Sequence, residues 1–168
     1  AFAASFYGVV RASLDVDVVI SLRPGQTELK PLTEELHGAG LKTTYRAGDA
    51  RDPVGAVLNV EDAFRNRVDL LMSIRGMPET AFSRTVETEF MSARIHVIGL
   101  EDFIAMKLFA GSPKGVDDVA SALRVSADRL RLPLLKELAG RYGTEAFERL
   151  ESLLRELAKL EHKHVSPK

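Results

Sequence analysis

The chain has 168 residues, of which 45% are hydrophobic and 28% charged, so it can form one globular domain, alone or with a helical extension. Its 23 basic and 24 acidic residues give a net charge of −1, which excludes bulk electrostatic attraction to nucleic acid but leaves a local basic patch open. It has no cysteine and no apolar run near the roughly 18 residues of a membrane-spanning helix, so a disulfide framework, a thiolate zinc site and a membrane partner are not expected.

The first hundred residues alternate between strand and helix patterns. Small apolar residues before Gly8 predict the end of a helix. β-Branched residues predict a strand over 15–21, and three leucines at helical spacing predict a helix that ends near Gly38. Further strands are predicted over 41–46, 56–60 and 67–74, followed by a hairpin of strands 85–90 and 95–98. We therefore expect a mixed β-sheet flanked by helices.

From Leu100 onward the pattern is helical throughout. Helices are predicted over 101–110, over 116–123, from Ser126 to about residue 141 with a kink or break at Pro133, and from Thr144 onward. The expected fold class is therefore α+β, with a core at residues 1–99 and a helical region at residues 100–168 that packs on it.

Two carboxylates stand two residues apart at the start of the first predicted strand. Asp15 and Asp17 point to the same face because strand side chains alternate, and their mutual repulsion favours binding of a cation. Asp69 lies within the apolar strand 67–74, where an ionised side chain is costly unless it is paired or bound to a metal. On adjacent strands the three acids can hold two Mg²⁺ or Mn²⁺ ions, the arrangement used for displacement at phosphorus.

The same acids have plainer interpretations. A solvated strand start accounts for Asp15 and Asp17, and an edge position in the sheet accounts for Asp69. Glu87 and Glu89 share one face of a predicted strand and compete with Asp69 as the third acid. The residues alone leave these alternatives open.

Two lysines are candidates for binding phosphate. Lys107 follows Phe103 by four residues and Ile104 by three, so its stem lies along the apolar face of a helix. Its ammonium group must then reach an anion, either a buried carboxylate or a phosphate. Lys114 precedes a predicted helix start, where backbone N–H groups favour anions. Asp118 can pair with either lysine or stabilise the helix dipole.

Residues 7–17 read YGVVRASLDVD, and this segment resembles the signature of the nucleotidyltransferase (DNA polymerase beta-like) superfamily, most closely that of small prokaryotic AbiEii-type toxins. Residues 97–107 are similar to the family's strand-then-helix segment that ends in lysine. Residues 112–119 are similar to its Lys-Asp-x-x-Asp segment, with Gly115 in place of the first Asp. The resemblance implies catalytic and metal-binding roles for Asp15, Asp17 and Asp69, phosphate-binding roles for Arg11, Ser13, Lys107 and Lys114, and a supporting role for Asp118.

The family's glycine pair lets backbone amides approach the phosphates, and it would fall at or just before Ala1. The chain does not begin with Met. We therefore expect either that the pair lies upstream of Ala1 or that it is degenerate in this chain.

The resemblance implies a Mg²⁺- or Mn²⁺-dependent transferase that moves a nucleoside monophosphate from an NTP to a hydroxyl acceptor, which can be tRNA, a protein side chain or a small molecule. The alternative is a catalytically inactive protein of the same fold that binds a nucleotide, an antitoxin in a toxin–antitoxin pair, or a second copy along Leu150, Leu154 and Leu157. A third interpretation is a phosphodiesterase or nuclease that uses the same acids. A cytoplasmic location is expected.

Overall fold

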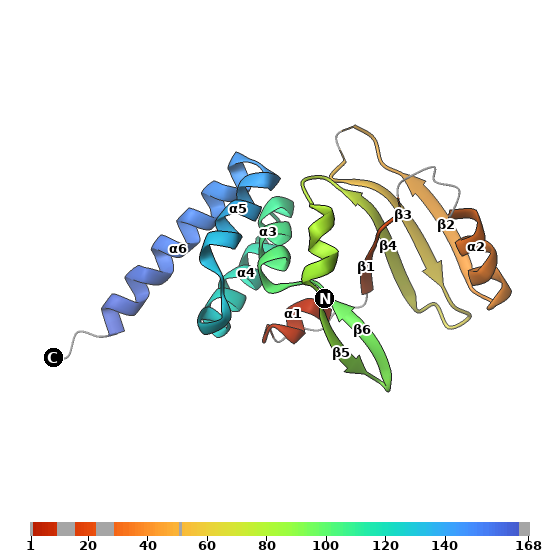
Figure 1. The fold of residues 1–168 in the computed structure, drawn as a ribbon, viewed down its shortest axis with the longest axis horizontal. Helices are drawn as coiled ribbons and strands as arrows, with labels where there is room; N and C mark the ends of the chain where they lie inside the picture. Colours follow the sequence, from red (N-terminus) through yellow and green to blue (C-terminus); the bar gives the residue numbers. More distant parts are fainter. Residues whose placement is uncertain (1, 10–15, 23–28, 51, 165–168) are drawn as a thin grey trace. The chain divides into compact units, whose positions relative to one another are not determined.

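The computed structural model describes residues 2–9, 16–22, 29–50 and 52–164, and the chain divides into two compact units (Figure 1). The first, which we call the sheet unit, comprises Ala1–Phe2 and Arg11–Arg75. The second, the helical unit, comprises Ala3–Val10 and Gly76–Lys168. The predicted class, a mixed sheet followed by a helical C-terminal half, is confirmed. The domain boundary between residues 99 and 100 stays a prediction.

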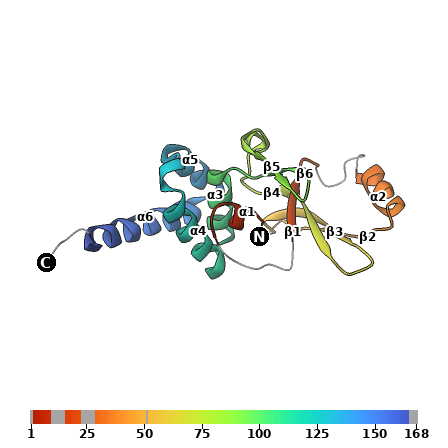
Figure 2. The ribbon, with the colours of Figure 1, turned by 90° about the horizontal axis from the view of Figure 1, so that it is seen from below.

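The described residues of the sheet unit form five elements: β1 (Val16–Ile20), α2 (Leu29–Gly38), β2 (Lys42–Ala47), β3 (Val54–Glu61) and β4 (Arg67–Ile74). All five were predicted, with small shifts at their ends. The strands lie in the order β1-β4-β3-β2, with β1 parallel to β4 and the other two pairs antiparallel. Helix α2 lies beside β2 in both views of the ribbon (Figures 1 and 2).

One face of this sheet carries the apolar core of the sheet unit. Alternate residues of β3 and one residue of β4 are buried on it, because side chains of a strand point to opposite faces in turn. The leucines of α2 pack against this face, as the helical spacing predicted. The buried residues are Ala56, Leu58, Val60 and Met72. The residues between them in the sequence, such as Asn59, belong to the opposite face, which we call the polar face.

The helical unit contains a short hairpin and a group of helices. Its centre is α3 (Leu100–Ala110), in which Phe103, Ile104 and Leu108 are buried and which packs against α4, α5 and α6. The other elements are α1 (Phe2–Phe6), the 3-10 helix η1 (Glu79–Arg84), β5 (Val86–Phe90), β6 (Ala93–Val97), α4 (Pro113–Val125), the 3-10 helix η2 (Ala127–Arg129), α5 (Leu132–Tyr142) and α6 (Thr144–His164).

Two helix boundaries differ from the prediction. Helix α4 begins at Pro113 rather than at residue 116, because the Ser112 side chain accepts a hydrogen bond from the Gly115 N–H and proline suits a first helical turn. The helix predicted from Ser126 onward is interrupted, and α5 starts only at Leu132. Pro133, in the first turn of α5, lacks an N–H and would clash with a preceding helical turn, so it produces a break and not a kink.

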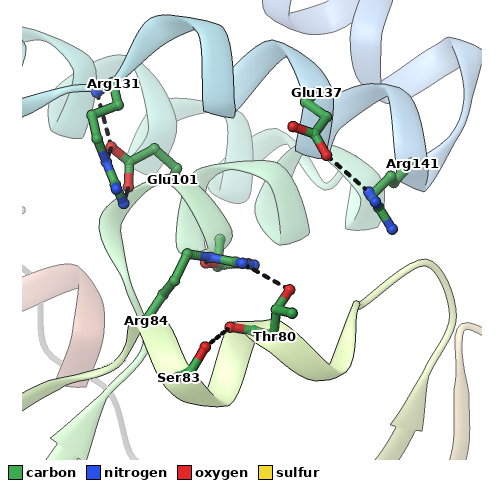
Figure 3. Close-up of polar contacts among 8 residues, drawn as sticks. Thr80, Ser83, Arg84, Glu101, Arg131, Glu137 and Arg141 are labelled. Carbon is green, nitrogen blue, oxygen red and sulfur yellow. Dashed lines mark hydrogen bonds and ion pairs between the residues drawn. The ribbon is translucent and has the colours of Figure 1, made fainter.

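Two ion pairs lie at the start of α3, and Figure 3 shows the one between Glu101 and Arg131. Arg84 donates from Nε and Nη2 to the two oxygens of Asp102, each at 2.7 Å, and the Asp102 side chain is fully buried. Glu101 accepts a hydrogen bond from the Arg131 backbone N–H at 2.8 Å and lies 3.3 Å from the Arg131 Nε. Because both acids stand in the first turn of α3, the helix dipole also stabilises their charge. The two pairs connect Arg84 of η1, and Arg131 directly before α5, to the first turn of α3.

The Glu101–Arg131 pair predicts a dependence of stability on pH. Burial acts to raise the pKa of Glu101, but the hydrogen bonds from the Arg131 side chain and backbone outweigh it, and this pKa lies below its ordinary value of 4.5. A group with a lowered pKa in the folded state stabilises the fold fully above its unfolded pKa and loses that contribution as the pH falls through its folded pKa. The benefit of Glu101 is therefore complete at neutral pH and is lost in acid.

We expect Glu101→Gln to lower the free energy of unfolding by a constant amount at neutral pH, and this difference from the unsubstituted protein to shrink below about pH 4.5, as Glu101 itself becomes protonated. Urea unfolding followed by circular dichroism, at a series of pH values, measures the difference. A difference that stays the same down to acid pH would show that the charge of Glu101 does not stabilise the fold.

Candidate functional site

Two of the three predicted metal-binding acids are neighbours in the sheet. Asp17 of β1 and Asp69 of β4 are register partners in a parallel pair of strands. Partners in such a pair have their side chains on the same face, here the polar face. Asp15 lies outside the described residues. Like charges side by side are destabilising, so this placement favours a cation between them.

Asp69 has two partners within the protein. Asn59 Nδ2 donates to Asp69 Oδ1 at 2.6 Å, and Arg67 Nε lies 3.3 Å from the same oxygen. The Asp69 side chain is 17% exposed, so it is stabilised by these contacts rather than by water alone. Among the described residues, no hydrogen bond to Asp69 Oδ2 is formed, and the carboxylate of Asp17 has no hydrogen-bond or ion-pair partner. Each of these two acids therefore has at least one oxygen that can accept a hydrogen bond or bind a further ligand.

Carboxylate oxygens are the donors that Mg²⁺ and Mn²⁺ prefer. Within the part of the chain that the structure describes, no group of three or more His, Asp or Glu side chains gathers at one place. Asp17 and Asp69 are two such donors. Strand alternation predicts that Asp15 is the third, and its role stays a prediction.

A hollow of about 390 Å³ lies beside Asp69 in the sheet unit. Its charged lining residues are Arg46, Asp52 and Asp69, and its apolar ones include Val57 and Leu71. The segment that follows β2 forms part of its wall. There the Asp49 N–H donates to Asp52 Oδ2 at 2.9 Å, the Asp52 N–H donates to Asp49 Oδ1 at 3.2 Å, and Arg75 Nη2 donates to the carbonyl oxygens of Ala50 and Asp52.

The predicted phosphate-binding lysines lie in the helical unit. Lys107 Nζ is 3.5 Å from Asp118 Oδ2 and 5.8 Å from the centre of the Phe103 ring. Its ammonium group therefore pairs with a buried carboxylate, which is one of the two kinds of anion predicted for it. A contact with phosphate stays a prediction. Lys114 is exposed and lies inside the first turn of α4, not before the helix, which corrects the prediction and follows from the earlier start at Pro113.

The remaining candidates are placed only in part. Arg11 and Ser13 lie outside the described residues. Glu87 and Glu89 lie in β5, which belongs to the two-stranded sheet of the helical unit, and both are exposed. Glu87 has a partner in Arg94, at 3.8 Å.

Three residues of the polar face were not predicted: Asn59, Arg67 and Arg46. Arg67 stands two residues before Asp69, so strand alternation alone puts it on the same face. The proximity of Asn59 depends on the β3–β4 register, in which it is the partner of Asp69. Arg46 lines the hollow because the β2–β3 register makes it the partner of Val57, which also lines it. The sequence pattern contains no signal for either register.

A scan against protein-family models finds no match for this chain, and a search of curated proteins finds none either. Across the described residues, no helix is both long enough and apolar enough to cross a membrane.

Proposed function

We propose that this protein is a divalent-metal-dependent nucleotidyltransferase, with Asp15, Asp17 and Asp69 as its metal ligands. The observation that carries the proposal is the parallel register of Asp17 and Asp69, which puts two carboxylates side by side on the polar face of the sheet. The segment at residues 7–17, which resembles the nucleotidyltransferase signature, supplies the first two acids. The hollow beside Asp69 leaves room for a reacting molecule.

The donors suit Mg²⁺ or Mn²⁺, since they are carboxylate oxygens with no thiolate among them. When bound, the metal would activate the attacking oxygen and neutralise phosphate charge. Arg11 and Ser13 would hold phosphates of the NTP. The resemblance also implies a phosphate-binding role for Lys107, which Asp118 would orient through the contact at 3.5 Å. Lys114 would add a cation at the first turn of α4.

The reaction is an in-line displacement at phosphorus. The oxygen of the acceptor hydroxyl forms a bond to the α-phosphorus of the NTP, and the bond from that phosphorus to the oxygen bridging to the β-phosphate breaks. Pyrophosphate leaves, and Asp69 accepts the proton of the acceptor hydroxyl. Asn59 and Arg67, which both contact Oδ1 of Asp69, keep this carboxylate oriented.

A second candidate function is a nucleotide-binding or antitoxin-binding protein without catalysis. The observation that favours it is that two of the candidate residues, Asp69 and Lys107, already have partners of opposite charge within the protein. Arg67 lies beside Asp69, and Asp118 lies beside Lys107. A protein that only binds would take up an NTP and release no pyrophosphate.

The test is incubation of the protein with each of the four labelled NTPs and Mg²⁺, together with total RNA and cellular protein. We expect label to move to one acceptor class, with one pyrophosphate released per transfer and no reaction in EDTA. NTP binding without pyrophosphate release would favour the second candidate. Metal-dependent cleavage of RNA in the absence of any NTP would indicate a nuclease and contradict the proposal.

A further inference from the structure

The hollow extends from Asp69 in one direction across the sheet. It is lined by residues of β2, β3 and β4 and by the segment between β2 and β3. Since the strand order is β1-β4-β3-β2, the hollow lies on the side of Asp69 that is away from β1 and Asp17. A molecule bound there would lie next to Asp69, on the side of it that faces away from Asp17.

The floor of the hollow combines an aliphatic surface with one guanidinium group. Arg46, Val57 and Leu71 form one row across the sheet, because Arg46 is the register partner of Val57 and Val57 is the register partner of Leu71. Val54 and Pro53 add to the apolar lining. This row is adjacent to the one that contains Asn59 and Asp69.

Arg46 differs from the other arginines near the polar face in having no partner among the described residues. Arg67 lies beside Asp69, and Arg75 donates to two backbone carbonyl oxygens. Of the acids that line the hollow, Asp52 accepts a hydrogen bond from the Asp49 N–H and Asp69 has the partners already described. The guanidinium of Arg46 is therefore available to a ligand.

We infer that the hollow is the acceptor subsite and that Arg46 selects an acceptor that carries a phosphate group next to its reactive hydroxyl, that is, a nucleotide. The planar guanidinium can donate two parallel hydrogen bonds to a phosphate. The aliphatic row suits the ring of the base or sugar, and about 390 Å³ is within the range of pockets that bind small molecules. The inference rests on the proposed function, in which Asp69 takes the proton of the acceptor hydroxyl.

A free nucleotide and the end of an RNA present the same chemistry to Arg46, and two arms of the experiment distinguish them. The acceptors are adenosine monophosphate, adenosine and a short RNA, each with labelled NTP and Mg²⁺. Binding of the first two is also measured directly by calorimetry, with the NTP site saturated by a non-hydrolysable analogue. The variants are Arg46→Gln and Arg46→Lys. The control is Lys42→Gln, because Lys42 is an exposed cation on the same face of β2, at the opposite end of the strand and outside the hollow.

We expect the unsubstituted protein to bind adenosine monophosphate more tightly than adenosine, and Arg46→Gln to weaken binding of the phosphorylated ligand about tenfold to a hundredfold. Arg46→Lys should recover part of the loss, and Lys42→Gln should change nothing. In transfer, Arg46→Gln should raise the KM for the phosphorylated acceptor and leave the KM for the NTP unchanged.

The outcomes separate the two proposals. If Arg46→Gln transferred the nucleotide to a protein hydroxyl at the same rate as the unsubstituted protein, the inference would be overturned. The proposed transferase activity would not be contradicted. Equal affinity for adenosine and its monophosphate would also overturn it. Arg46-dependent binding without any transfer would support a phosphate-binding hollow and contradict the transferase.

Discussion

Replacement of Asp17 with Asn is expected to reduce nucleotide transfer by about a thousandfold or more, with little change in stability. The substitution keeps the size of the side chain and removes the negative charge that a divalent cation needs. Metal stabilisation of a phosphoryl transition state contributes several kcal/mol, and each 1.36 kcal/mol corresponds to about a factor of ten in rate. The Asp17 side chain is exposed and has no hydrogen-bond or ion-pair partner among the described residues, so we expect the fold not to depend on its charge.

The measurement is the initial rate of pyrophosphate release at saturating NTP and Mg²⁺, together with the affinity for Mn²⁺ measured by its paramagnetic signal. Asp128→Asn is the matched control, since Asp128 is an exposed aspartate of η2 in the helical unit. It should leave both rate and affinity unchanged. Undiminished transfer or Mn²⁺ binding in Asp17→Asn would remove Asp17 from the metal site.

Replacement of Arg84 with Met is expected to lower the free energy of unfolding by about 3–5 kcal/mol. It leaves the Asp102 carboxylate, which is fully buried, without the two hydrogen bonds at 2.7 Å that compensate its charge. Stabilities of single domains are about 5–15 kcal/mol, so a loss of this size is a large fraction of the total. Urea unfolding at neutral pH, followed by far-UV circular dichroism, measures it.

Two further variants separate the cost of a buried charge from lost packing. Arg94→Met removes an arginine that is 82% exposed and pairs with Glu87 at 3.8 Å, and it should have a much smaller effect. The double variant Arg84→Met, Asp102→Leu removes both charges and should recover much of the loss, because apolar replacements of a buried pair are often neutral. A double variant no more stable than Arg84→Met alone would show that packing, and not charge, dominates at this position.

Residue order was enough to predict elements whose patterns are local. The leucines of α2 recur at helical spacing, and the short apolar runs in β3 and β4 are typical of strands, so these elements were predicted close to their observed ends. Helix starts that depend on capping were harder. Helix α4 begins three residues before its predicted start because the Gly115 N–H, which has no partner within the helix, donates to the Ser112 side chain. The spacing of apolar residues does not predict that hydrogen bond.

In the polar site, too, some features follow from the local sequence and others only from the tertiary structure. Strand alternation by itself determined that Asp69 faces away from Val68 and Leu70 and shares a face with Arg67, since this depends only on the backbone period of two. That Asp17 stands opposite Asp69, that Asn59 donates to it and that Arg46 reaches the same hollow were decided by the tertiary structure. The physical reason is that strand order and register arise from the packing of the whole sheet against α2, where burial of the apolar face selects one pairing among many that the local sequence allows.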